Sequence, residues 1–156
     1  MIIRYANEKD IPRLIELLQQ VLELHADIRP DIFISGTTKY TEAELQDKLN
    51  DDDNPIYVAV DDNDRVLGYA FCQIQEPTNK NNCVPIKNIY IDDLCVSEEA
   101  RGQHVGKALF DHVKAEGKRL GCYEVTLCVW TGNDNAERFY ENLGMKTKER
   151  VMEYIL

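Results

Sequence analysis

The residues best suited to bind an anion lie in one short segment, Arg101-Gly102-Gln103-His104-Val105-Gly106-Lys107, which opens a helical pattern. A helix that begins at such a turn directs several unpaired backbone N–H groups, and the positive end of its dipole, toward one point. Glycines let a ligand approach the backbone, and Arg101 adds a fixed positive charge. The segment could therefore form a phosphate or pyrophosphate site. The alternative is a plain helix with a glycine-containing start, and two glycines and an arginine alone favour that alternative. The segment lacks the Gly-Lys-Ser/Thr ending of a Walker loop and the Gly-x-Gly-x-x-Gly pattern of a dinucleotide loop.

Two adjacent carboxylates, Asp92 and Asp93, interrupt the β-branched run of residues 86–96 that precedes this turn. A positioned carboxylate can act as a general base. Successive residues of a strand face opposite sides of its sheet, so both carboxylates can reach one site only if a bulge intervenes. The alternative is that either aspartate is a hydrogen-bonded structural residue.

A second segment carries Asn133, Ala136 and Tyr140, whose separations of three and four place them along one face of a helix. A small residue in the middle of this face lets a slender ligand lie against the helix. Tyr140 could then donate a proton to that ligand, or it could be a half-buried tyrosine of the core.

Together the two segments resemble the GNAT superfamily of acyl-CoA N-acyltransferases. Arg101 to Gly106 is similar to its Arg/Gln-x-x-Gly-x-Gly/Ala signature, with His104 at the first signature glycine, and residues 133–145 are similar to its later Asn-x-x-Ala-x-x-Leu/Phe-Tyr block. The acidic pair before an Arg-Gly turn is similar to spermidine/spermine acetyltransferases. The resemblance covers most of the chain. It implies an α/β (α+β) fold: a mixed, mostly antiparallel sheet of about six or seven strands, helices on both faces, and a splayed central strand pair.

The resemblance also implies acetyl transfer from acetyl-CoA to a primary amine by direct attack in a ternary complex. It makes Tyr140 the general acid and Asp92 the base, acting through a water because aspartate is shorter than the family's glutamate. It places the acceptor near His25, Arg29, Asp92 and Asp93, and a thioester carbonyl near the N–H of Leu94 or Cys95. His25 could be a general base or a solvated helix end, and Arg29 could bind a substrate carboxylate or anchor the loop. The residues that match the family's cofactor-binding segments are Leu94, Cys95, Val96, Arg101, Gly102, Gln103, His104, Val105, Gly106, Lys107, Asn133, Ala136 and Tyr140.

Hydrophobic periodicity predicts the elements that position these residues. Strands are expected at residues 2–5, 56–60, 66–74, 86–96 and 123–130, with one or two more at 146–156. A first helix should follow a cap at Asn7 and run to about His25, and a short one should follow a capping box of Thr41 and Glu44. Two more helices are expected at 105–120 and 134–144. The whole chain, 1–156, is predicted to be one N-acetyltransferase domain.

Charge and composition exclude other classes of partner. The 156 residues carry a formal net charge of −10, which repels nucleic acid and attracts a cationic amine. No run approaches the roughly 20 apolar residues of a membrane span, and the N-terminus has no signal-peptide pattern. The five cysteines and three histidines lack metal-ligand spacing, so we predict no metal site and a cytoplasmic protein.

Three functions fit these observations. The first is an N-acetyltransferase acting on a small cationic amine. The second is an acetyltransferase of protein N-termini or lysines, and the third is a CoA-binding regulatory module without turnover, for which His104 is the main support. The resemblance also allows a homodimer formed through the last strand.

Overall fold

The computed structural model describes residues 1–78 and 80–156. Two short 3-10 turns, Glu8–Asp10 and Glu98–Ala100, precede α1 and α3. The strands form one sheet in the order β1-β2-β3-β4-β5, antiparallel except that β5 runs parallel to β4. This confirms the predicted α/β class. The elements in chain order are β1 (Ile2–Tyr5), α1 (Ile11–Ile28), α2 (Glu42–Lys48), β2 (Ile56–Val60), β3 (Val66–Gln75), β4 (Asn88–Val96), α3 (Val105–Arg119), β5 (Glu124–Leu127) and α4 (Asp134–Asn142).

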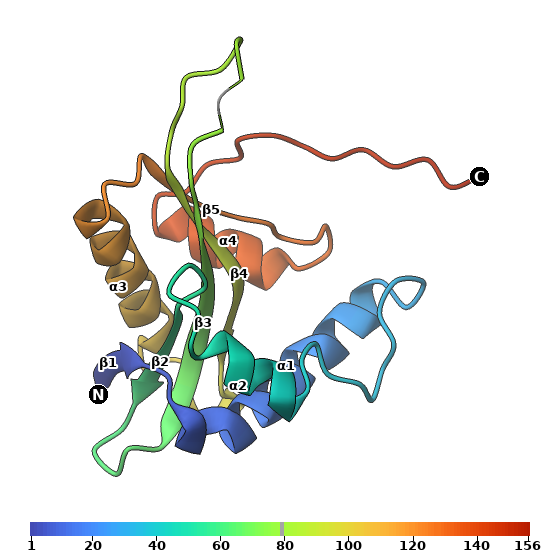
Figure 1. Cartoon of the computed structure of the whole chain (residues 1–156). Coiled ribbons are helices and arrows are strands. Elements are labelled where there is room, and N and C mark those ends of the chain that lie inside the picture. Colours follow the sequence, from blue (N-terminus) through green and yellow to red (C-terminus); the bar gives the residue numbers. More distant parts are fainter. Residues whose placement is uncertain (79) are drawn as a thin grey trace.

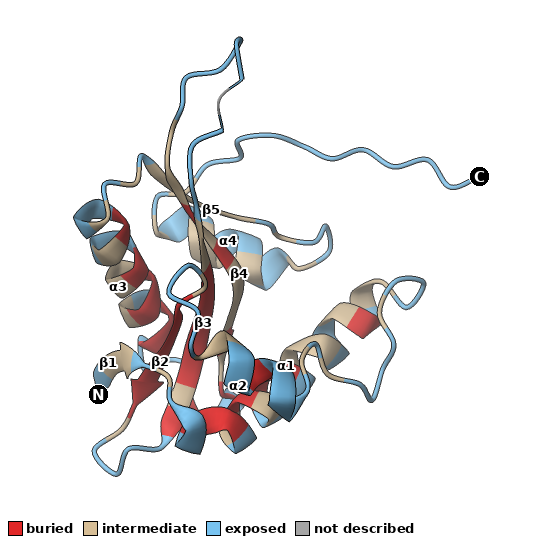
Figure 2. Ribbon diagram, viewed as in Figure 1, coloured by how far each residue is buried: buried red, intermediate tan, exposed pale blue. Residues whose placement is uncertain are grey.

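Helices cover both faces of the sheet (Figure 1). On one face, α1 and α2 bury leucines such as Leu14, Leu18 and Leu45 against β2 and β3. On the other face, α3 buries Leu109 and Val113, and α4 packs beside it. The buried residues concentrate on the central strands and on the helix surfaces that face them (Figure 2). The site is therefore built on a sheet held rigidly between two apolar layers.

Both predicted caps are present. The Asn7 side chain accepts a hydrogen bond from the backbone after it, and Asp10 accepts one from Asn7 N–H at 2.9 Å, which completes a capping box. Thr41 and Glu44 form a second box at the start of α2. This second cap matters for the site because it fixes the end of the long connection between α1 and α2.

The pairing of β4 with β5 ends early. It runs only from Asn88 opposite Glu124 to Ile91 opposite Leu127, whereas β4 continues to Val96. Beyond Ile91, β4 is paired with β3 alone and its other edge is open. The predicted splayed strand pair is thus β4 and β5.

The predicted number of strands is wrong. Within the part of the chain that the structure describes, the sheet has five strands, β5 is shorter than residues 123–130, and no strand forms in residues 146–156. A strand needs a neighbour for its backbone hydrogen bonds, and the C-terminal segment instead runs away from the sheet (Figure 1). Its apolar side chains are exposed, with Val151 at 92% and Tyr154 at 87%.

Across residues 1–78 and 80–156, no helix is both long and apolar enough to cross a membrane. The same residues contain no group of three or more His, Cys, Asp or Glu side chains arranged to hold a metal ion. All five cysteines are free thiols.

Candidate active site

A β-bulge in β4 shifts the alternation of its side chains at the acidic pair. Along the β3–β4 ladder Cys72 lies opposite Ile91 and Phe71 lies opposite Asp93, so Asp92 is an extra residue in the ladder. An extra residue lets two consecutive side chains project to the same face of a sheet. The condition under which Asp92 and Asp93 can serve one site is therefore met.

The contacts of the two carboxylates place them on the face covered by α1 and α2. Asp92 Oδ2 accepts hydrogen bonds from Lys39 Nζ at 2.7 Å and from Tyr40 Oη at 3.1 Å. Asp93 Oδ2 accepts one from Tyr69 Oη at 3.2 Å. Tyr40 and Tyr69 both pack in the core between the sheet and these helices. The two carboxylates thus lie between β4 and the connection that joins α1 to α2.

Burial determines the protonation of Asp93. Removal from water raises the pKa of its carboxyl to about 6, and the negative charge of Asp92 acts in the same direction. The positive charge of Lys39 and the hydrogen bond from Tyr69 lower this pKa and offset part of the burial effect. A carboxyl with such a pKa is ionised at neutral pH but binds a proton readily, which is what a general base requires.

The open edge of β4 presents backbone groups beside the acidic pair. Ser97 N–H donates to Leu67 C=O of the β3 side at 2.8 Å, which fixes the alternation of the ladder. Counting back from Ser97, Asp93 and Cys95 direct their backbone groups toward β3, and Leu94 and Val96 direct theirs to the open edge. Val96 C=O there accepts a hydrogen bond from Gln20 Nε2 of α1 at 3.0 Å.

The turn before α3 has a left-handed backbone at Gly102 and at His104, with φ of 78° and 61°. Such residues curl the chain so that successive N–H groups point into one concavity, a common anion site. Residues 101–104 are exposed, and a side chain at Gly102 would meet no atom within 4 Å, so space beside the turn is open. Gly106 differs: Phe139 Cζ lies 3.1 Å from where its Cβ would be, so this glycine lets α4 pack against α3.

His104 carries backbone strain that glycine would not have. We expect His104→Gly to increase the free energy of unfolding by about 0.5–1 kcal/mol, because a left-handed conformation disfavours a residue with Cβ. Urea unfolding followed by circular dichroism measures the change. Gly102→Ala at φ 78° is the matched control and should have the opposite sign. A loss of stability in His104→Gly would show that the imidazole makes contacts that outweigh the strain.

The α4 residues lie on the other side of the open edge. Asn133 is the N-cap of α4, and its side chain accepts a hydrogen bond from Ala136 N–H at 3.3 Å. Tyr140 packs in the core with α3, and its ring lies 5.0 Å from that of Phe139. Burial and then the negative charge of Asp93 raise the pKa of Tyr140 well above its usual value. Tyr140 is therefore a phenol at all working pH values and lies within electrostatic range of Asp93.

A family model for the acetyltransferase (GNAT) family matches residues 18–145, which is most of the chain. The chain belongs to the GNAT acetyltransferase family. Membership confirms the predicted enzyme class, an acetyltransferase, and agrees with the order of the sequence segments described above.

Individual relatives of this GNAT protein agree with the family. A variant of the BH1408 protein of Bacillus halodurans has a TM-score of 0.95 at 31% identity, covering 100% of this chain and 99% of that one. An aminoglycoside N-acetyltransferase, AAC(6')-Iy, in complex with CoA has the same fold, with a TM-score of 0.74 at 21% identity over 99% and 98% of the two chains. Thialysine N-epsilon-acetyltransferase of Bos taurus is 32% identical over 79 residues, 51% of this chain and 44% of that relative. The match thus spans less than half of the length of that curated protein.

Arg29, a predicted acceptor residue, is held by other parts of the GNAT protein. Its guanidinium pairs with Asp31 at 2.7 Å and with Glu153 of the C-terminal segment at 2.8 Å. It also lies 5.9 Å from the ring centroid of Trp130. These contacts favour a role as an anchor of the loop over a role as a ligand for a substrate carboxylate.

His25, the other predicted loop residue, lies beside Phe33 with ring centroids 5.1 Å apart. Burial and then the positive charge of Lys39 lower the pKa of His25, so its imidazole is neutral at pH 7. The His25 imidazole is therefore able to accept a proton. Its link to the acidic pair is indirect, because the same Lys39 charge that acts on His25 pairs with Asp92.

Sequence reasoning missed Lys39, Tyr40 and Tyr69, which hold the acidic pair. Lys39 and Tyr40 lie in a loop without periodicity, so no pattern in the sequence points to them. Tyr69 did have a signal. It occupies an inward position of a buried strand, where a tyrosine hydroxyl needs a hydrogen-bond partner.

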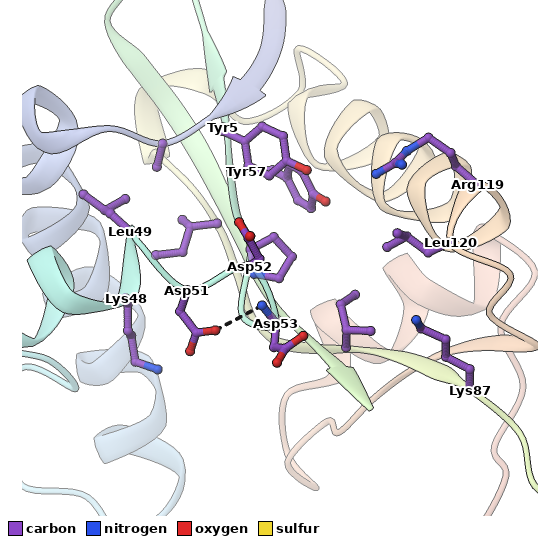
Figure 3. A pocket seen from close by; sticks show the side chains of 14 residues that line it. Tyr5, Lys48, Leu49, Asp51, Asp52, Asp53, Tyr57, Lys87, Arg119 and Leu120 are labelled. Carbon is purple, nitrogen blue, oxygen red and sulfur yellow. Dashed lines mark hydrogen bonds between the residues drawn. The ribbon is translucent and has the colours of Figure 1, made fainter. Parts of the chain in front are cut away.

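The structure also has a cavity of about 500 Å³ whose lining does not include the acidic pair. Tyr5 and Tyr57 project into it, and Arg119 and Leu120 at the C-terminal end of α3 form part of its wall (Figure 3). The signature turn lies at the opposite end of this helix of 15 residues, about 22 Å away. None of the predicted site residues lines the cavity, so it is no part of the candidate active site.

Proposed function

We propose that this GNAT protein transfers the acetyl group of acetyl-CoA to a primary amine, by direct attack of the amine on the thioester in a ternary complex. The observation that carries the proposal is the β4 bulge, which brings two carboxylates to the point where β4 and β5 separate. An amine is protonated at neutral pH and cannot attack until a base removes its proton. A carboxylate pair supplies both a binding site for the ammonium group and that base.

The open edge and the turn fit coenzyme A. Leu94 and Val96 direct backbone groups outward, where an extended amide chain can pair with them as an added strand does. Leu94 N–H is favoured over Cys95 N–H as the donor to a thioester carbonyl, since the latter faces β3. Backbone N–H groups of the exposed turn and of the first turn of α3 would hold the pyrophosphate, with Arg101 nearby. Acetyl-CoA bound there supplies an activated acyl group.

The acid and base of this proposal come from opposite sides of the open edge. Tyr140 keeps its proton and can give it to a leaving thiolate. Of the two carboxylates, Asp92 matches the family's base. Asp93 is a suitable proton acceptor because burial raises the pKa of its carboxyl to about 6, and Asp92 is engaged in an ion pair with Lys39. We therefore assign proton removal to the pair, with Asp93 as the residue that takes up the proton.

The pH dependence follows from this assignment. A base must be ionised to work, so kcat/KM should rise with pH through about 6, the pKa of Asp93, and level off above it. Initial rates of thiol release at low amine concentration measure the profile. An acidic limb that falls near pH 4, where an unperturbed carboxyl titrates, would contradict the assignment of Asp93.

A small cationic amine is the acceptor that the charges support. The net charge of −10 attracts cations, and the site itself presents two carboxylates. The name of the bovine relative, a thialysine N-epsilon-acetyltransferase, is that of an enzyme acting on a side-chain amine. These observations favour polyamines, amino-sugar antibiotics or basic amino acid derivatives over neutral amines.

The test is a panel of amines with acetyl-CoA, read out by thiol release and by mass spectrometry of the products. Diamines, polyamines, an aminoglycoside, basic amino acids and a lysine-containing peptide form the panel. Turnover of the small cations supports the proposal, and turnover of the peptide alone would indicate a protein acetyltransferase instead. Binding of acetyl-CoA without any turnover would indicate a non-catalytic module.

We further infer a homodimer as the working form. The C-terminal segment exposes Val151, Met152, Tyr154 and Ile155, and β5 is an edge strand that could accept another strand. Pairing of this segment with β5 of a second copy would bury both. Light scattering should give the mass of a dimer for the full chain and of a monomer for a chain cut after Lys148. A full chain that stays monomeric at high concentration would contradict this inference.

A further inference from the structure

Lys39 places a primary amine of the chain itself at the acidic pair. Its Nζ lies 2.7 Å from Asp92 Oδ2, and its side chain is 39% exposed, against 19% for Asp92. The contact is more than a chance surface pair. The next residue, Tyr40, donates to the same carboxylate oxygen at 3.1 Å and stacks on Phe71 of β3 with ring centroids 5.7 Å apart.

The surroundings keep this segment in place. Lys48 Nζ of α2 lies 4.7 Å from the ring centroid of Tyr40. The capping box of Thr41 and Glu44 fixes the backbone directly after Tyr40, at the start of α2. Lys39 is therefore presented to β4 by a packed tyrosine and a capped helix.

The position of Lys39 coincides with that proposed for the acceptor. Asp92 is the first residue of β4 beyond its last pair with β5, where the open edge begins. The positive charge of Lys39 also reaches Asp93, whose pKa it lowers against the effect of burial. A substrate ammonium group drawn to these carboxylates would occupy the place that Lys39 Nζ holds now.

We propose that Lys39 is a self-acetylation site, an inference that depends on the acetyl-transfer activity proposed above. The Lys39 ammonium gives one proton to the carboxylate pair, and the free amine forms an N–C bond with the thioester carbonyl carbon. The C–S bond then breaks and the thiolate takes a proton from Tyr140. The nitrogen loses its second proton as the amide forms; one of the two protons shed by the nitrogen restores the Tyr140 phenol, and the carboxylate pair passes the other to solvent. The products are Nε-acetyl-Lys39, free CoA thiol and one proton released to solvent.

Acetylation would change the site as well as mark it. It removes the positive charge of Lys39, so the ion pair with Asp92 is lost and only the Tyr40 hydroxyl remains on that oxygen. The acidic pair would then present its full negative charge to an external cation. The modification thus converts a site occupied by its own lysine into one open to an amine substrate.

The experiment incubates the full-length protein with acetyl-CoA and no amine, and follows acetylation by intact mass and by peptide mapping. We expect one acetyl group per chain on Lys39, with a rate constant independent of protein concentration because the reaction is intramolecular. Two exposed lysines, Lys80 and Lys146, report direct chemical acetylation by the thioester in the same sample. Lys39→Arg keeps the charge and should abolish the modification at this position. Asp92→Asn should slow it at least tenfold.

The controls separate this inference from the proposed function. A protein that acetylates an added amine but modifies Lys39 no faster than Lys80 and Lys146 overturns self-acetylation and leaves the proposed function standing. A rate constant that grows with protein concentration also overturns it, because the reaction would then pass between molecules. A protein that transfers acetyl groups neither to Lys39 nor to any amine of the panel overturns both. Thermal melts of the two variants verify that they are folded.

Discussion

Replacing Asp93 by asparagine is expected to lower kcat for acetyl transfer by about 10²–10⁴-fold, the usual contribution of a positioned general base. Asparagine keeps the size of the side chain and can still accept a hydrogen bond from Tyr69 Oη, which lies 3.2 Å from the carboxylate. The substitution therefore removes the basic group with little change in packing. Steady-state thiol release with the best amine of the panel measures the loss.

The same substitution should stabilise the fold, and this separates a catalytic role from a structural one. The pKa of Asp93 is raised to about 6 in the folded protein, so folding favours the protonated form. The contribution of Asp93 to stability is greatest below pH 4, falls as pH rises to about 6, and is constant above. Asparagine does not ionise, so at pH 7 Asp93→Asn should unfold with a free energy higher by about 1–3 kcal/mol.

Asp92→Asn is the matched control. Because Asp92 already pairs with Lys39 at 2.7 Å, its loss should weaken binding of a cationic acceptor more than it lowers kcat. A larger fall in kcat for Asp92→Asn than for Asp93→Asn would show that Asp92, and not Asp93, is the general base. Destabilisation by Asp93→Asn at neutral pH would mean that Asp93 is a structural carboxylate.

Tyr140→Phe carries the second large effect, a loss of about 10²-fold in kcat with the affinity for acetyl-CoA kept within about twofold. The hydroxyl is the only group removed, and the ring still packs beside Phe139. Burial keeps Tyr140 protonated, so its hydroxyl is available to the leaving thiolate at any pH at which the enzyme works. Steady-state rates and calorimetric titration with acetyl-CoA measure the two quantities.

Tyr154→Phe is a suitable control for this substitution, since Tyr154 is 87% exposed in the C-terminal segment. It should leave both quantities unchanged. An unchanged kcat for Tyr140→Phe would show that the thiolate leaves without a protein acid. A parallel loss of acetyl-CoA affinity would instead make Tyr140 a binding residue.

Local signals in the sequence were sufficient for most of the fold. The caps at Asn7 and Thr41, the periodic leucines of α1 and the turn before α3 depend on neighbours a few residues away, and each was predicted where the structure has it. The strand predicted at residues 146–156 failed because pairing is a property of two segments. Its alternating apolar residues describe one segment only, and the single chain supplies no second strand beside it.

The site was predictable only in part, for the same reason. The roles proposed for Tyr140 and for the signature turn came from the resemblance of their segments to the family, since their spacing alone is equally that of ordinary helices. The contact of Lys39 with Asp92 joins residues 53 positions apart through a loop, and it depends on Tyr40 packing against Phe71. No periodicity records such a contact. The presence of the bulge in β4 could not be predicted from the sequence, because one extra residue in a strand does not change the composition of the strand.

β4 has one residue more than its pairing with β3 requires, and that residue is Asp92. If Asp92 were deleted, Ile91 would still lie opposite Cys72 and Asp93 opposite Phe71, and the ladder would close without a gap. Every remaining side chain of the strand would keep its side of the sheet. Residue 92 is thus an insertion that the sheet does not need. A chain that lacks it should fold into the same sheet with a single half-buried carboxylate, Asp93, at this point.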